Sequence, residues 1–416
     1  MKQWKVLLAS ILGNTLEYYE FSIFAVFAVQ IGQAFFPSQD SVNQILLTLA
    51  LFGAGFLSRP LGSAVFGHIG DRLGRKRSLI LTITGMSVAT FGIGFMPSYN
   101  SIGITAPILL LILRLLQGFF IGGEGAGSAV YVLEHQMKMD RNIVGGFLIT
   151  SNISGIIIAS MVGLIITKTV GLDQTTWRYA FIAGGVAGVI ISYMRLKLPE
   201  SEKFNKLEES EKRKVPLFDL FTKYWKQVLV VVSFAGFSSG VSYIVKGYLS
   251  VHFQKFMNLS PDTSFLLLMY TTFIFAALPP FWGILSKRYT YRKLLRVTSV
   301  LIALLYVPIF MLISTPNYYA LIGGLTLMAM IASAILTPTY IYFSDLFPTS
   351  LRYSGVAVSF NIGITLIGGF TPVMSTYLVD QTSIPYAPAF YIVALAIFYL
   401  ILESFMHKRI EYFDQD

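Results

Sequence analysis

The residues of this sequence that could do chemistry are charged side chains inside long apolar segments. There are three acids and three bases: Glu17, Glu20, Glu124, Arg59, Arg114 and Lys246. A charge at the centre of a membrane-spanning helix costs about 2.5–3.5 kcal/mol on insertion scales, so such groups usually pair or face a cavity. We therefore interpret these side chains as candidates for carrying a proton or for binding a polar substrate.

Two of the acids share one helix face with Asn14, because Asn14, Glu17 and Glu20 are spaced three residues apart. Two close carboxylates repel each other, which suits one of them to bind a proton reversibly near neutral pH. We favour Glu17 as the proton site because Arg114 lies nearer in depth to Glu20, which would then be paired or contact the substrate. Glu124 is the next candidate. The alternative is a purely structural ion pair with Arg114.

The remaining intramembrane bases have two interpretations each. Arg59 and Glu124 lie at similar depth in their segments and are expected to pair, either for gating or substrate contact or as a structural pair. Lys246 either holds a substrate carboxylate or extends to the outer membrane interface. Most aromatic residues are expected to face lipid or the membrane interface, but Tyr18 and Tyr19 are candidates to line a cavity, where an aromatic face can hold an ammonium group.

Membrane-spanning helices must position these side chains. The chain has 416 residues, 55% hydrophobic and 12% charged, against about 25% charged residues in a soluble domain. This composition excludes a soluble enzyme, and the lack of cysteine excludes a disulfide scaffold or thiolate metal site. Long apolar runs argue against an outer-membrane barrel. We expect an all-α integral membrane protein with twelve transmembrane helices, at residues 5–34, 43–68, 78–97, 105–133, 143–167, 178–198, 226–252, 264–285, 294–313, 317–344, 353–379 and 386–406.

The distribution of basic residues predicts the orientation. If the N-terminus is cytoplasmic, 25 of the 31 Lys and Arg residues, Lys138 among them, lie on the cytoplasmic side and three on the opposite side. Both termini and the polar linker 199–225 would then be cytoplasmic. The same distribution accounts for the net charge of +10 without a nucleic acid partner. The predicted domains are an N-terminal six-helix bundle (1–198), the linker (199–225) and a C-terminal six-helix bundle (226–416).

The two halves repeat each other weakly, which predicts two pseudo-symmetric bundles. The loop GHIGDRLGRKR at 67–77 has a counterpart 216 residues later, GILSKRYTYRK at 283–293, in which Lys287 replaces the acid. Tyr131, Glu134 and Arg141 recur 211 residues later as Tyr342, Asp345 and Arg352. Transporters built from such repeats bind their substrate between the halves, near the bilayer midplane. Of these residues, the four charged ones (Glu134, Arg141, Asp345 and Arg352) either form inner-gate ion pairs or remain solvated surface charges.

These segments resemble the major facilitator superfamily. The first loop matches its signature G-x-x-x-D-R-x-G-R-K in full, with Gly67, Asp71, Arg72, Gly74, Arg75 and Lys76, and R-x-x-Q-G in the fourth span supplies Arg114 and Gln117. The segments GNTLEYYEF (13–21), GGE (122–124) and LFPTSLRYS (346–354) resemble the metabolite:proton symporters, although Tyr18 and Glu20 replace the usual Trp and Asp. The resemblance implies that Asp71 and Arg75 latch the two halves together in one state of the transport cycle.

The sequence thus predicts a secondary active transporter rather than an enzyme. It would take up a small polar metabolite, a carboxylate or a zwitterion such as proline or betaine, together with protons by alternating access. We expect no metal or cofactor other than the proton, and a monomer in the bilayer of the bacterial inner membrane. The alternative is a membrane-embedded channel or enzyme without proton coupling. An ATP-driven pump would need the motif G-x-x-x-x-G-K-[ST], which does not occur.

Overall fold

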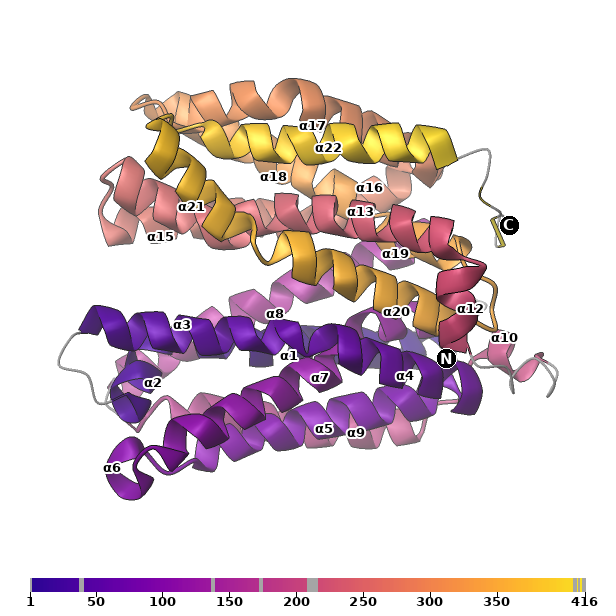
Figure 1. Ribbon diagram of the computed structural model, residues 1–416, viewed down its shortest axis with the longest axis horizontal. Helices are drawn as coiled ribbons and strands as arrows, with labels where there is room; N and C mark the ends of the chain where they lie inside the picture. The colour runs from indigo at the N-terminus through magenta and orange to yellow at the C-terminus, as the bar shows by residue number, and fades with distance from the viewer. Residues whose placement is uncertain are drawn as a thin grey trace. The chain divides into compact units, whose positions relative to one another are not determined.

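The architecture is helical throughout the part of the chain that the structure describes. This structure is a computed structural model, and it describes residues 2–36, 41–135, 139–171, 175–207, 216–406, 410 and 412–413. Every regular element in these ranges is a helix (Figure 1). Ten of the helical segments are long and apolar enough to cross a membrane. The predicted all-α membrane fold class is therefore confirmed.

The chain divides into two compact units, and the first consists of Met1–Gln136, Ser151–Leu217 and Thr349–Val358. In this unit α5 lies beside α7 and α9, and α1 also lies against α7 and α9 (Figure 1). The apolar core contains Phe24, Phe27, Ile83 and Met86. The helices are α1 (Lys2–Val26), α2 (Ala28–Phe35), α3 (Ser41–Leu57), α4 (Arg59–Leu73), α5 (Arg75–Phe95), α6 (Tyr99–Ile102), α7 (Thr105–Glu134), most of α8 (Arg141–Thr169), α9 (Arg178–Leu196) and α10 (Glu202–Asn205).

The second unit consists of Met137–Thr150, Phe218–Pro348 and Ser359–Asp416. In it α17 lies beside α18 and α22, and three segments have π-helical hydrogen bonding. The helices are α12 (Pro216–Thr222), α13 (Trp225–Tyr243), η1 (Ile244–Tyr248), α14 (Leu249–Val251), η2 (His252–Phe256), α15 (Pro261–Ala277), α16 (Pro279–Leu285), α17 (Tyr291–Ile313), α18 (Tyr318–Leu336), α19 (Thr339–Asp345), the end of α20 (Arg352–Gly363), η3 (Ile364–Gly368), α21 (Thr371–Thr382) and α22 (Ala387–Met406).

The helix boundaries follow the predicted spans closely, and several interruptions occur at proline. α15 gives way to α16 at Pro279, and α18 gives way to α19 next to Pro338, because proline lacks the amide hydrogen that the preceding turn needs. The predicted spans 5–34 and 43–68 are not among the ten apolar segments. The first carries two acids in its middle, and the second is divided into α3 and α4 at Ser58.

Each unit includes a short segment from the other sequence repeat. Thr349–Val358, which holds the start of α20, belongs to unit 1, and Met137–Thr150, which holds the start of α8, belongs to unit 2. The two exchanged segments occupy corresponding places in the repeats, since Arg141 and Arg352 are the matched pair from the sequence. Lys138, Lys408, Arg409 and the middle of the linker (208–215) lie outside the described residues.

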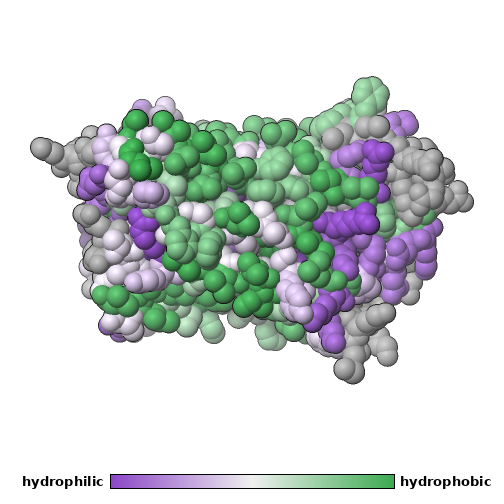
Figure 2. Space-filling view, turned by 90° about the horizontal axis from the view of Figure 1, so that it is seen from below, coloured by the Kyte–Doolittle hydropathy of each residue, from purple (hydrophilic) through white to green (hydrophobic). Residues whose placement is uncertain are grey.

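The surface is that of a protein in lipid. Figure 2 shows a broad band of hydrophobic residues across the visible face, with hydrophilic residues gathered at its ends. Many large apolar side chains are exposed, for example Leu57, Val88, Phe95 and Phe273. A soluble protein rarely exposes so large a contiguous apolar area, so the band fits contact with the acyl chains of a bilayer.

Candidate functional site

A chain of hydrogen bonds connects Glu20 to Arg114 inside unit 1. The Thr90 hydroxyl lies 2.6 Å from Oε2 of Glu20, and Nε2 of Gln117 donates to the same hydroxyl at 2.6 Å. Nη1 of Arg114 donates to Oε1 of Gln117 at 2.7 Å. The three helices α1, α5 and α7 supply these groups, all of which are buried. The sequence-based alternative of a direct ion pair between an acid and Arg114 is therefore wrong, because Gln117 and Thr90 lie between the charges.

Several buried polar atoms in the same region have no hydrogen-bond partner among the described residues. They belong to five side chains, and they are Nδ2 and Oδ1 of Asn14, Oε2 of Glu17, Oε1 of Glu20, Nε of Arg59 and Nε of Arg114. A buried polar group without a partner is costly, so in native proteins it usually marks a ligand, a water or a functional site. None of these four charged side chains forms a direct ion pair with another described residue.

Arg59 and Arg114 contact the faces of phenylalanine rings and do not form ion pairs with carboxylates of the described residues. The guanidinium carbon of Arg59 lies 4.6 Å from the ring centre of Phe21 and 4.4 Å from that of Phe56. That of Arg114 lies 4.2 Å from the ring centre of Phe24. Cation–π contacts of this kind contribute about 0.5–2 kcal/mol each, which only partly offsets the cost of burial. Both guanidinium groups therefore retain the capacity to bind an anionic group.

The expected pairing of Arg59 with Glu124 is wrong, because Glu124 pairs with Arg195. Nη2 and Nη1 of Arg195 lie 2.5 and 2.9 Å from the two carboxylate oxygens, and the Thr82 hydroxyl donates to the second oxygen at 2.6 Å. Sequence reasoning missed Arg195, since it lies near the end of a span and was counted among the cytoplasmic bases. Its exposed fraction is 2%, so it is a buried base rather than a solvated one.

Two further candidates lie in different units. Tyr18 is half-buried on α1, where its Cβ lies close to Gly155 of α8. Lys246 is half-buried in the π-helical segment η1 of unit 2, with its amine 5.5 Å from the ring centre of Phe275. A π-helical turn in an otherwise α-helical segment is frequent at functional sites. Lys246 therefore remains a candidate for contact with the substrate.

At one end of unit 1, Asp71 caps a helix from the other sequence repeat. Its Oδ1 accepts a hydrogen bond of 3.1 Å from the amide of Tyr353, and its Oδ2 accepts one of 2.8 Å from the amide of Ser354. These amides belong to the first turn of α20, where a carboxylate satisfies donors that have no partner within the helix. We call the set Asp71, Arg75, Glu134, Arg352, Tyr353 and Ser354 the Asp71 cluster.

Burial shifts the pKa of Asp71. This residue lies in the loop motif that follows the predicted span 43–68. Desolvation raises the pKa of its carboxyl to about 6, against the opposing effects of Arg75 and of the Ser354 and Tyr353 donors. The Arg75 guanidinium lies 3.2 Å from Oδ1. A carboxyl group with this pKa changes its charge near physiological pH, whereas an exposed one remains ionised there.

Arg75 and Arg352 converge on Glu134 in the same cluster. Nε and Nη2 of Arg75 donate to the Glu134 carboxylate at 2.9 and 3.0 Å, and Nη1 of Arg352 lies 3.6 Å from it. The Ser201 hydroxyl donates to the same carboxylate at 2.5 Å. All three charged side chains are buried. Buried ion pairs are costly to break from one side, so this cluster holds the start of α20 firmly in unit 1.

The glycines of the loop motif provide close approach and a tight turn. A Cβ on Gly67 would lie 2.8 Å from Cα of Ser354, so only glycine allows this approach. Gly74 has a φ of 108°, in a region that favours glycine. The other motif residues have simpler roles: Lys76 donates to the carbonyl of Leu196 at 2.8 Å, and Arg72 is exposed.

The corresponding cluster in unit 2 is built differently. We call Asp140, Arg141, Lys287, Tyr291 and Asp345 the Asp345 cluster. Nη2 of Arg141 lies 3.0 Å from Oδ1 of Asp345, and the Tyr291 hydroxyl donates to Oδ2. Tyr291 occupies the repeat position of Arg75. Lys287, at the position of Asp71, lies 3.9 Å from Asp140, which accepts a hydrogen bond from the Asn142 amide at the start of α8.

The repeat therefore conserves the arrangement but changes the chemistry. Each acid pairs with a base from the other repeat, Glu134 with Arg352 and Asp345 with Arg141, but Glu134 also pairs with Arg75 of its own repeat. In unit 1 the helix is capped by Asp71 from a distant segment. In unit 2 the helix has its own acid, Asp140, and the residue at the Asp71 position is a lysine that pairs with it.

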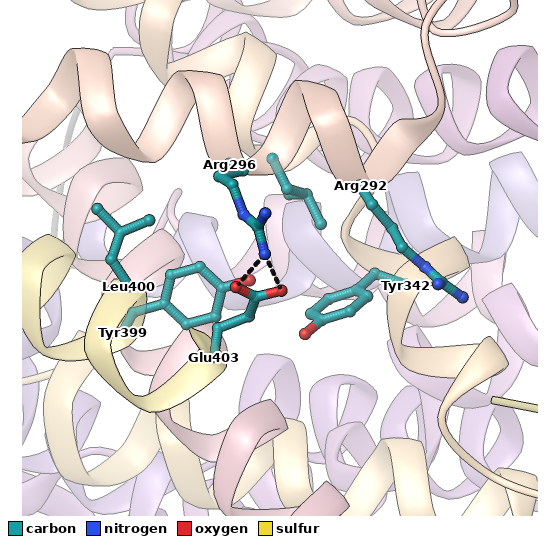
Figure 3. Close-up of a pocket in the computed structure, with 7 residues that line it drawn as sticks. Arg292, Arg296, Tyr342, Tyr399, Leu400 and Glu403 are labelled. Carbon is teal, nitrogen blue, oxygen red and sulfur yellow. Dashed lines mark hydrogen bonds and ion pairs between the residues drawn. The ribbon is translucent and has the colours of Figure 1, made fainter. Parts of the chain in front are cut away.

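A small cavity in unit 2 lies next to α17 and α22 and adjoins the Asp345 cluster, because Arg292, which lines it, donates a hydrogen bond of 3.3 Å to the Tyr291 hydroxyl. Figure 3 shows Arg296 forming two hydrogen bonds to the Glu403 carboxylate, at 3.1 and 2.9 Å, beside Tyr342 and Tyr399. Arg296 is 54% exposed, and exposed ion pairs contribute little. The sequence analysis did not single out this pair, and nothing in its geometry suggests a substrate site.

Comparisons with known proteins agree with this architecture. The family model described as "Major Facilitator Superfamily" matches residues 10–359 and, in a second overlapping match, residues 247–409. The chain is 33% identical over 411 residues to the proline/betaine transporter of Escherichia coli (strain K12), covering 95% of this chain and 82% of that protein. It is 33% identical over 417 residues to the glycine betaine/proline/ectoine/pipecolic acid transporter OusA of Dickeya dadantii (strain 3937), covering 97% and 83%.

Solved structures show the same fold. The proton:xylose symporter XylE bound to 6-bromo-6-deoxy-D-glucose matches with a TM-score of 0.80 at 15% identity, covering 99% of this chain and 96% of that one. A double tryptophan mutant of XylE matches with a TM-score of 0.82 at 16% identity, covering 100% and 97%. With its loop signature, its helical fold and its relatives in agreement, the chain belongs to the major facilitator superfamily, and within it to the group that includes the proline/betaine transporters.

Proposed function

We propose that this chain takes up a small zwitterionic metabolite, of the proline or betaine type, together with protons by alternating access. The relatives that cover nearly the whole chain are transporters of proline, betaine, ectoine and pipecolic acid by name. Such solutes carry a carboxylate and a nitrogen cation on one small molecule. The proposal extends that substrate class to this chain, and the unpaired charges in unit 1 give it a physical basis.

The observation that carries the proposal is a set of two buried acids and two buried bases that form no ion pairs with one another. Glu124 and Arg195 neutralise each other directly, which leaves Glu17 and Glu20 against Arg59 and Arg114. Each of these four costs free energy in the membrane, and all four have a buried polar atom without a partner. A zwitterion offers a carboxylate for the guanidinium groups and a cation for the carboxylates. A simple anion or cation would satisfy only half of the set.

The polar and aromatic side chains around these charges fit the same kind of ligand. Asn14 has both side-chain polar atoms buried without a partner and shares the helix face of the two acids. Phe21, Phe52 and Phe56 form a cluster of rings with centroids 4.3–5.8 Å apart. These rings hold the guanidinium groups of Arg59 and Arg114 and so position the two cations that would meet the substrate carboxylate. We assign Asn14, Glu17, Glu20, Arg59 and Arg114 to substrate binding or proton coupling, with Tyr18 and Lys246 as further candidates.

Alternating access requires contacts that can open on one side. We propose that the Asp71 and Asp345 clusters are these contacts, because each holds a short helix start from the other repeat. In this view the two six-helix bundles are residues 1–198 and 226–416, joined by 199–225, and the clusters lie on the cytoplasmic side of the bacterial inner membrane with both termini. The oligomeric state that we propose is a monomer.

Uptake into proteoliposomes tests the proposal. An inwardly directed proton gradient should drive accumulation of radiolabelled glycine betaine or proline above the external concentration, and a protonophore should abolish it. A channel would only equilibrate the solute. Choline, which has the cation but lacks the carboxylate, and acetate, which has only the carboxylate, serve as matched controls and should compete poorly. Equal competition by acetate would show that the carboxylate alone is recognised and contradict the zwitterion assignment.

A further inference from the structure

The hydroxyl group of Thr90 has more partners than it has hydrogens. Its oxygen lies 2.6 Å from Oε2 of Glu20, 2.6 Å from Nε2 of Gln117 and 3.0 Å from the carbonyl oxygen of Met86. A hydroxyl donates one hydrogen bond and accepts two. Thr90 can therefore donate either to Glu20 or to Met86, but not to both at full strength.

Arg114 fixes the orientation of the Gln117 amide. A guanidinium group only donates, so the Gln117 atom that faces Arg114 at 2.7 Å must be the carbonyl oxygen. The other end of the amide, Nε2, then donates to the Thr90 oxygen. Gln117 thus occupies one of the two acceptor positions on Thr90 and leaves the second one open.

These constraints allow two hydrogen-bond arrangements with the same heavy-atom positions. When Glu20 is ionised, Thr90 donates its hydrogen to Oε2 of Glu20. When Glu20 carries a proton, Oε2 donates that proton to the open acceptor position of Thr90, and Thr90 rotates its own hydrogen to the Met86 carbonyl. The switch moves hydrogens only. Thr90 has an acceptor for its hydrogen in both arrangements, and its second acceptor position is filled when Glu20 is protonated.

Glu20 is the acid whose surroundings match this behaviour. Its Oε1 has no partner among the described residues, and the Thr90 hydroxyl is the hydrogen-bond partner of its Oε2. The titratable groups that interact electrostatically with Glu20 are Glu17 and Tyr19 on α1 and Glu124 on α7, whereas Arg59 and Arg195 act on the neighbouring Glu17. Glu124 is held by Arg195, the Tyr19 hydroxyl donates to the carbonyl of Ala180 at 2.8 Å, and Arg114 reaches Glu20 only through Gln117 and Thr90.

We propose that Thr90 is a positioning residue that lets Glu20 take up and release the coupled proton without a rearrangement of its neighbours. The inference rests on the proposed proton coupling, and it selects Glu20 rather than Glu17, the acid that sequence depth alone favours. In the balanced step, one proton enters from the aqueous side and binds Oε2 of Glu20. The same proton leaves on the other side when Thr90 donates to the carboxylate again.

The test compares Thr90→Val with Thr90→Ser. Valine has the shape of threonine without the hydroxyl, whereas serine keeps the hydroxyl. A hydrogen bond to an ionised group is stronger than one to a neutral group, so removing the hydroxyl disfavours ionised Glu20. The pH midpoint of gradient-driven uptake should therefore move up by about one pH unit in Thr90→Val and stay at the wild-type value in Thr90→Ser.

Ser87→Ala is the matched control. Ser87 lies one turn earlier on α5, is buried, and its hydroxyl donates to the carbonyl of Ile83 at 2.7 Å. This variant loses a buried hydroxyl on the same helix and should keep the wild-type pH midpoint. A shift in Ser87→Ala equal to that in Thr90→Val would show a general effect on the helix and overturn the assignment. Equal midpoints in wild type, Thr90→Val and Thr90→Ser would also overturn it.

A second measurement needs no change at Thr90 and applies if that variant does not fold. Infrared difference spectra of the wild-type protein between high and low pH should contain a protonated carboxyl band that disappears in Glu20→Gln. A band that persists in Glu20→Gln and disappears in Glu17→Gln would overturn the inference. These outcomes differ from a failure of the proposed function itself, because wild-type protein would then show no proton-driven accumulation at any pH.

Discussion

The Tyr353 hydroxyl donates a hydrogen bond of 2.7 Å to the carbonyl oxygen of Gly123, although 230 residues separate the two in the sequence. The ring fits between glycines of α4 and α7. A Cβ on Gly70 would lie 2.6 Å from Cδ2 of the ring, and a Cβ on Gly127 would overlap the hydroxyl. Tyr353 therefore fills a slot that exists only because these positions lack side chains. Its hydroxyl contacts Gly123, the residue next to Glu124 in the chain.

Filling this slot should disrupt transport. Gly127→Ala places a methyl group where the Tyr353 hydroxyl lies, so the start of α20 cannot dock on unit 1 as it does here. We expect at least a tenfold loss of the transport rate, measured as initial uptake into proteoliposomes. Gly53→Ala is the control, because a Cβ there meets nothing within 4 Å and both substitutions gain the same helix propensity of about 1 kcal/mol. Equal activity of the two variants would contradict a role for the slot.

Asp71→Asn should impair the transport rate while leaving substrate affinity within a few-fold of wild type. The amide side chain offers one acceptor oxygen to the two amide donors of Tyr353 and Ser354, and it removes a carboxylate from Arg75. The Asp71 cluster biases conformations rather than contacting substrate. Equilibrium binding of labelled glycine betaine and exchange rates provide the measurement. A large loss of binding with normal exchange would show that the assigned role is wrong.

The docking of α20 on Asp71 should also depend on pH. The pKa of Asp71 is about 6 when the amides of Tyr353 and Ser354 cover it, and about 3.9 for an exposed carboxyl. The docked state therefore binds more protons between these values, so docking is strongest in acid and weakens as pH rises to about 6. Hydrogen exchange of residues 353–358, corrected for intrinsic rates, should become faster from about pH 4 to about pH 6 and then level off. Asp71→Asn should abolish the trend, and an opposite trend would refute it.

Arg195→Gln should destabilise the protein strongly. It leaves the Glu124 carboxylate buried without its partner, and breaking a buried pair from one side costs about 3–5 kcal/mol. Arg296→Gln is the matched control, because Arg296 also forms two hydrogen bonds to a glutamate but is 54% exposed, where a pair contributes about 0–1 kcal/mol. Thermal unfolding in detergent measures both. Similar melting temperatures for the two variants would contradict a buried ion pair between Arg195 and Glu124.

Glu20→Gln and Glu17→Gln should separate proton coupling from substrate binding. Glu20→Gln should abolish accumulation driven by a proton gradient but retain counterflow exchange, which needs no net proton movement. Glu17→Gln should retain accumulation and weaken substrate affinity, because its unpaired Oε2 is available to the substrate cation. The reverse result would favour Glu17 as the proton site. Full accumulation in both variants would place the coupling proton elsewhere.

The sequence predicted the helices and the loop motif well, because apolar runs and glycine spacing are local features. It could not predict the exchanged partners, since Asp71 and Ser354 are 283 residues apart and only the fold brings them together. Arg195 was assigned to the aqueous side because a base near a span end is usually solvated. Its bidentate contact with Glu124 depends on how α7 and α9 pack, which the sequence does not specify.

The sequence also did not predict the roles of several uncharged polar residues. Thr90 lies in a segment with several threonines, so its position gave no signal, and Tyr353 was noted only as part of the segment LFPTSLRYS, without a role. Their roles come from atoms that converge from three helices: a hydroxyl between Glu20 and Gln117, and a ring between Gly70 and Gly127. By contrast, Gln117 stood out from the sequence through the motif R-x-x-Q-G, although not its position as the link between Arg114 and Thr90.

The most direct test of the account measures proton movement caused by the substrate itself. Glycine betaine is added to proteoliposomes that hold an internal pH dye and have no initial ion gradient. Proton-coupled uptake predicts acidification of the interior in step with betaine entry, absent in Glu20→Gln and absent with choline. Entry of labelled betaine at a normal rate without any change of internal pH would contradict proton coupling, and with it the central claim.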